Sequence, residues 1–202
     1  MREFYTWLKA HCVPWADVLT WGYGLVSESI TIATKGGPSH VRKVLFSVDR
    51  RMVVGAEMTE PCARYWTMYE IDPREIYGIV IGIHKDNKAV SPRRKRKALR
   101  WIERMVIQRL SYDEWELVAH LMNELGISSS DWSDKKKMVC SSFSAHIQQI
   151  LGKPWTNSLP LYNKLVSPYD IRYDPDFIVL ASLEREELEA MTGVSRQPSI
   201  TT

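Results

Sequence analysis

Two β-rich runs separated by a very short turn constrain this chain more than any other feature. The runs are HVRKVLFSVD (40–49) and RMVVGAEMT (51–59), and the turn falls near Asp49 and Arg50. Branched apolar residues in two such runs with a tight connection predict a β-hairpin. His40 opens the first run and Glu57 lies on the second, so a hairpin can bring them together although 17 residues separate them.

The remaining segments predict a mixture of helices and strands. A helix followed by a turn at Pro14 is expected within residues 1–20, a short helix or strand over 28–34, and a buried strand over 75–86. Helices are predicted over 91–110, 111–126, 139–152 and 182–193, and a last strand over 177–183. Residues 153–176, with four prolines, are expected to be rich in loops.

The three cysteines, Cys12, Cys62 and Cys140, lie far apart and are odd in number. No C-x-x-C pair occurs, so neither a zinc knuckle nor a disulfide framework is indicated, and a reducing compartment fits best. His120 and His146 have no ligand partner three or four residues away, so a helical metal site is not supported. We expect no metal and no cofactor.

The 202 residues fit one domain over 1–192, with a disordered tail over 193–202. The first 19 residues carry four charges and no uninterrupted apolar region, so no secretory signal is expected. No segment approaches about 18 apolar residues, which excludes a transmembrane span. We therefore expect a cytoplasmic protein, and a phage-encoded enzyme would fit equally well. The sequence leaves the oligomeric state open.

Cys140 lies at the expected start of the helix over 139–152. A helix N-terminus presents unpaired N–H groups and the positive end of the helix dipole, and both favour the thiolate. A cysteine at such a position is a candidate nucleophile. The alternative is a small buried apolar residue, which is the usual role of a free cysteine.

A thiol nucleophile needs a base within hydrogen-bonding reach, and the base needs a polar group that orients it. His40 follows the segment GGPS, whose glycines and proline favour a loop, and begins a strand. It is therefore the candidate base. Glu57 on the neighbouring strand would hold the imidazole and stabilise its charged form. The alternatives are a hydrogen-bonded loop histidine and an acidic residue on the surface of an edge strand.

Five segments in a fixed order resemble one family: the permuted papain-like hydrolases, in the YiiX/YaeF-like branch of the NlpC-type amidase superfamily. They are GYGLVSESITIATKGGPSHV (22–41), GAEMTE (55–60), LSYDEW (110–115), VCSSF (139–143) and LVSPYDIRYDPDF (165–177). The resemblance covers residues 21–180. Two features depart from the pattern: Ser142 stands where a glutamate is common, and the usual Gly-Asp opening is missing.

The resemblance implies an α+β, circularly permuted papain-like fold, in which an antiparallel sheet packs against the helix that carries the cysteine at its N-terminus. It also implies a cysteine peptidase, amidase or acyltransferase that acts on an amide or ester of a peptide or lipid, such as a cell-wall peptide. Cys140 would attack the carbonyl, His40 would carry the proton and Glu57 would orient His40. The backbone N–H of Cys140 would serve the oxyanion. Tyr112 would line the cleft, or else pack before the following helix.

The run RRKRK (93–97) favours a second hypothesis. Five consecutive cations can bind nucleic acid or an anionic surface, although a solvated helix start is the favoured interpretation. The alternative function is thus a non-catalytic binding module on the same fold, which would use its aromatic and basic surface. The reactivity of Cys140 separates the two functions.

Overall fold

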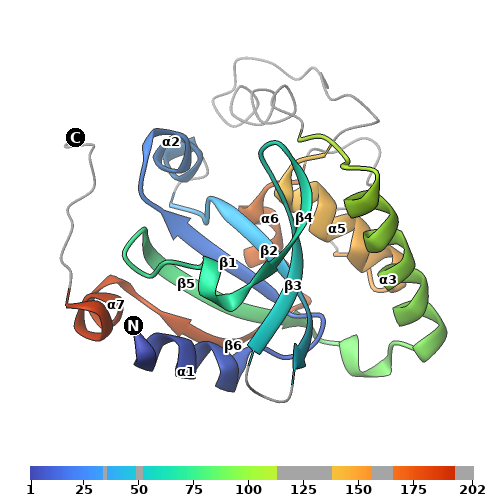
Figure 1. Ribbon diagram of the computed structural model, residues 1–202, viewed down its shortest axis with the longest axis horizontal. Helices are drawn as coiled ribbons and strands as arrows, with labels where there is room; N and C mark the ends of the chain where they lie inside the picture. The colour runs from blue at the N-terminus through green and yellow to red at the C-terminus, as the bar shows by residue number, and fades with distance from the viewer. Residues whose placement is uncertain (34–35, 49–51, 113–137, 156–165, 194–202) are drawn as a thin grey trace.

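A six-stranded antiparallel sheet forms the centre of the protein in the computed structural model (Figure 1), which describes residues 1–33, 36–48, 52–112, 138–155 and 166–193. The strand order across the sheet is β4-β3-β2-β1-β5-β6. The strands are β1 (Asp17–Gly22), β2 (His40–Val48), β3 (Met52–Thr59), β4 (Cys62–Thr67), β5 (Ile76–His84) and β6 (Phe177–Leu183).

Helices cover both faces of the sheet, so the architecture is a mixed α+β arrangement. The described helices are α1 (Arg2–His11), α2 (Leu25–Ala33), α3 (Pro92–Ile107), α5 (Cys140–Ile150), α6 (Pro168–Arg172) and α7 (Arg185–Thr192), with short 3-10 turns at Met68–Glu70 (η1) and Asn87–Ala89 (η2). Figure 1 shows α1 and α7 on one side of the sheet and α3 and α5 on the other. No helix within the described ranges is long and apolar enough to cross a membrane.

Each face of the sheet has its own apolar core. Phe4 and Leu8 of α1 and Leu188 of α7 pack with strand residues such as Val18 and Ile79. The opposite face receives α5, whose Phe143 and Ile147 pack with the α3 residues Ala98 and Ile102. The start of α5 is therefore held between the sheet and α3.

The predicted hairpin is confirmed: β2 and β3 pair antiparallel, with Lys43 opposite Ala56. The predicted helix within residues 1–20 and the turn at Pro14 are confirmed by α1 and by a turn at residues 14–15. The predicted strands over 75–86 and 177–183 correspond to β5 and β6, and the undecided segment 28–34 belongs to helix α2. Ser91 caps α3 as expected, since its Oγ accepts a hydrogen bond from the Arg94 N–H at 3.4 Å.

The structure contains three elements that the sequence did not predict. Residues 17–22 form β1, a central strand, and its Val18 and Leu19 are buried between neighbouring strands on both sides. Cys62 begins β4, the strand that follows the hairpin. The loop-rich stretch 153–176 contains α6, which Ser167 caps. The helix predicted over 111–126 and the tail predicted over 193–202 lie outside the described residues apart from 111–112 and Gly193.

Candidate active site at the start of helix α5

The hairpin brings His40 and Glu57 into direct contact. His40 is the first residue of β2, and its Nε2 lies 3.0 Å from Oε2 of Glu57 on β3. The carboxylate is 1% exposed and the histidine side chain 20% exposed, so solvent reaches the imidazole but hardly reaches its partner. A buried carboxylate in this position fixes the orientation of the ring.

Two arginines hold Glu57 in its charged form. Arg42 Nε lies 2.7 Å from Oε2 of Glu57, and Arg64 Nη2 lies 2.7 Å from Oε1. Arg42 shares the face of β2 with His40 because the two are two residues apart, and Arg64 lies directly opposite Glu57 on β4. Burial would raise the pKa of Glu57, but the hydrogen bond with His40 and the three positive charges lower it to about 2.

The thiol of Cys140 is the second partner of the His40 ring. Cys140 is the first residue of α5, and its thiol interacts with the His40 imidazole both as a charge and as a hydrogen-bond partner. Because Nε2 of the ring faces Glu57, Nδ1 is the nitrogen left for the sulfur. His40 therefore bridges a thiol and a carboxylate, the order of groups that activates a cysteine nucleophile.

The surroundings favour a thiolate on Cys140 and a proton on His40. Burial raises the pKa of Cys140, but the charge and hydrogen bond of His40, with the backbone N–H groups of Val41 and Ser141, lower it below its ordinary value. Burial and the charge of Arg42 lower the pKa of His40, but Cys140 and Glu57 raise it by more. Both shifts favour the thiolate–imidazolium form of the pair over the neutral form.

A buried polar network fixes α5 against the sheet beneath the cysteine. Ser144 and Gln148 follow Cys140 at intervals of four residues, so all three share one face of the helix. Ser144 Oγ donates to Asp17 of β1, and Gln148 Oε1 accepts from Nζ of Lys43 on β2 at 3.3 Å. Asp17 and Lys43 form an ion pair at 2.6 Å with both side chains fully buried.

A cavity of about 610 Å³ opens beside the histidine. Its wall includes His40, Arg42 and Tyr112, with Glu70 and Asp72 on another part of the wall. Cys140 is not among the residues of this wall, and it is 5% exposed. A substrate carbonyl must therefore reach the sulfur past the edge of the imidazole or after a local opening.

The predicted residues are brought together: His40 contacts Glu57 and interacts with Cys140, and Tyr112 shares a cavity with His40. The structure adds residues that the sequence did not predict: Arg42, Arg64 and the anchor formed by Asp17 and Lys43. Alternation along β2 is a signal that points to Arg42, because a cation two residues after a candidate base lies on the same face. No local signal marks Arg64, since its role depends on the register between β3 and β4.

The fold has a known counterpart. A crystal structure described as metalloprotein YiiX from Escherichia coli O157:H7, DUF1105, superimposes with a TM-score of 0.60 at 15% sequence identity, over 86% of this chain and 99% of that one. At this identity the likeness concerns the fold alone. No protein-family model matches the chain, and no curated protein matches it.

The description of that structure as a metalloprotein prompts a test of this chain for a metal site. Among the residues whose structure is described, no group of three or more His, Cys, Asp or Glu side chains is arranged to hold a metal ion. The donor side chains within the described ranges therefore do not fit a resident metal.

Proposed function

We propose that this protein is a cysteine-dependent hydrolase or acyltransferase of the permuted papain-like class, acting on an amide or ester. The observation that carries the proposal is the position of His40 between Cys140 and Glu57. The motifs that resemble the YiiX/YaeF-like branch support it, and so does the superposition on the YiiX structure.

In the proposed reaction, the Cys140 thiolate attacks the carbonyl carbon of the substrate. The carbonyl electrons move to oxygen, and the backbone N–H of Cys140 at the start of α5 stabilises the resulting oxyanion. The intermediate collapses when the bond to the leaving group breaks, and the protonated His40 gives its proton to the departing nitrogen or oxygen. A thioester on Cys140 and a neutral His40 remain.

In the second half of the reaction, His40 takes a proton from the incoming nucleophile, which attacks the thioester carbonyl. The C–S bond then breaks, and the Cys140 thiolate returns beside a protonated His40. Water as nucleophile releases a carboxylic acid and makes the protein a hydrolase. A substrate hydroxyl or amine as nucleophile makes it an acyltransferase. Glu57 stays ionised throughout and stabilises the imidazolium, as its pKa of about 2 implies.

Two features of the cavity fit this chemistry. Its volume of about 610 Å³ falls in the range of small-molecule sites. Tyr112 in its wall is placed to contact a substrate that touches His40, which is the role proposed for it. We infer that the cavity receives the part of the substrate next to the reacting carbonyl.

An activated ester tests the proposal. Incubation with p-nitrophenyl acetate should acetylate Cys140, and mass spectrometry of the peptides locates the adduct. The measurement is made in a Cys62→Ser background, because Cys62 is the more accessible of the other thiols. Acetylation of Cys140 that is lost in His40→Ala supports the enzyme. No adduct on Cys140, or an adduct independent of His40, favours the non-catalytic binding module instead.

A further inference from the structure

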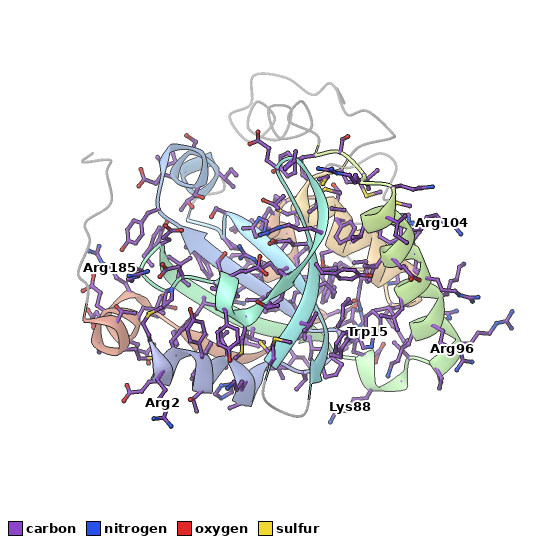
Figure 2. The ribbon with its side chains drawn as sticks, in the orientation of Figure 1. Arg2, Trp15, Lys88, Arg96, Arg104 and Arg185 are labelled. Carbon is purple, nitrogen blue, oxygen red and sulfur yellow. The ribbon has the colours of Figure 1, made fainter. Side chains whose placement is uncertain are left out.

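The outward face of α3 carries a stripe of positive charge. Arg93, Arg96, Lys97, Arg100 and Arg104 recur at intervals of three and four residues, and all five are exposed. Figure 2 shows Arg96 and Arg104 projecting from α3 away from the body of the protein. The opposite side of the helix buries Ala98 and Ile102 against the core. We call the five cations the α3 stripe.

The charges of the α3 stripe are not neutralised within the described structure. None of the five forms an ion pair with another described residue, and the first turn of α3 contains no acidic residue. Cations in the first turn also oppose the helix dipole, which favours anions at that end. Arg104 in the last turn is favourably placed, so the cost falls on the cations at the start of the helix, and an anionic partner would remove it.

The apolar residues of α3 indicate what kind of partner this is. Ile107 continues the face of the stripe at the end of the helix and is 73% exposed, and Leu99, two turns earlier on the same helix, is 39% exposed. Phosphates of a nucleic acid would satisfy the cations but would leave Ile107 in water. A membrane interface can accommodate the cations and also Ile107, because cations bind lipid phosphates while an apolar side chain enters the boundary with the acyl chains.

We propose that the α3 stripe docks the protein on an anionic phospholipid surface. The 16 residues of α3 would lie along the plane of that surface, with the stripe against the headgroups and Ile107 at their inner edge. Electrostatic attraction supplies most of the binding, so it weakens as salt screens the charges. This inference concerns a surface outside the site of Cys140 and does not depend on the proposed chemistry.

Co-sedimentation with vesicles tests the proposal. At low salt the protein should sediment with vesicles of phosphatidylcholine mixed with phosphatidylglycerol and should stay in solution with phosphatidylcholine alone. The triple variant Arg96→Gln/Arg100→Gln/Arg104→Gln should bind on the order of 100-fold more weakly, since each cation near an anionic surface contributes about a fivefold factor. Ile107→Gln should weaken binding without changing the dependence on salt.

A matched control separates the stripe from net charge. The triple variant Arg2→Gln/Lys9→Gln/Lys85→Gln removes the same charge from α1 and the end of β5, and Figure 2 places Arg2 at a distance from Arg96 and Arg104. It should retain nearly full binding, and circular dichroism checks that both variants fold. Equal binding to the two kinds of vesicle, or equal losses in the two triple variants, would overturn the proposal. Stripe-dependent binding to a DNA duplex without binding to vesicles would overturn it as well.

Discussion

His40 Nε2 lies 3.0 Å from Glu57 Oε2, so one strand of the hairpin supplies the histidine and the next supplies the carboxylate that orients it. This contact assigns the two ring nitrogens: Nε2 faces Glu57 and Nδ1 is left for Cys140. The pairing of β2 with β3 thus determines how the imidazole is oriented, while α5 brings the thiol to it.

Acid should destabilise the protein through Glu57. Its pKa is lower in the folded protein, about 2, than the ordinary value of 4.5, so the folded state binds this proton less readily than the unfolded chain. The contribution to stability is full above pH 4.5, is lost as the pH falls toward 2, and amounts to about 3 kcal/mol. Glu57→Gln should show a smaller loss over this interval in urea unfolding at a series of pH values. If the free energy of unfolding of Glu57→Gln fell with pH as steeply as that of the wild type, Glu57 would not be the source of the acid sensitivity.

The two arginines should contribute unequally to the charge of Glu57. Arg42 is 18% exposed and Arg64 is 48% exposed, so water screens Arg64 more strongly. Arg42→Gln should raise the pKa of Glu57 more than Arg64→Gln does. NMR titration of the Glu57 carboxyl carbon measures both values, and an equal or reversed effect would refute the ranking.

Lys43 should be far more important for stability than a surface lysine with a similar contact. Lys43 and Asp17 are both fully buried, so Lys43→Met leaves a carboxylate buried with Ser144 as a remaining partner. The expected loss is about 3–5 kcal/mol in urea unfolding. The control is Lys85→Met, which removes an exposed lysine 2.5 Å from Asp176 and should cost less than about 1 kcal/mol. Similar losses in the two variants would contradict this account.

Local patterns were sufficient to predict much of the fold. Branched apolar residues marked β2, β3 and β5, and Ser91 with Pro92 marked the start of α3, because these signals act within a few residues of chain. β1 was missed because Asp17 and Thr20 interrupt its apolar residues, and their burial is explained only by distant partners. Asp17 is buried because Lys43 and Ser144 meet it there.

The candidate site was predictable where the hairpin alone determined it. His40 and Glu57 could be paired from the sequence, since one turn brings them together. Arg64 joins the site through the register of a further strand, and Lys43 joins through a contact with Gln148 that spans 105 residues. Contacts of that kind depend on the packing of α5 against the sheet, which no local pattern specifies.

The labelling rate of Cys140 tests the central claim most directly. Burial raises the pKa of Cys12 to about 12, so Cys12 should remain unlabelled by iodoacetamide, whereas the lowered pKa of Cys140 gives it a larger thiolate fraction than an ordinary thiol at about pH 6.5. His40→Ala removes the charge and hydrogen bond that lower this pKa, and labelling at that pH should fall by at least about tenfold. Peptide mass spectrometry in a Cys62→Ser background follows each thiol separately. Fast labelling of Cys140 that depends on His40 is the predicted result. Labelling as slow as that of Cys12, and unchanged by His40→Ala, would contradict the assignment of Cys140 as nucleophile.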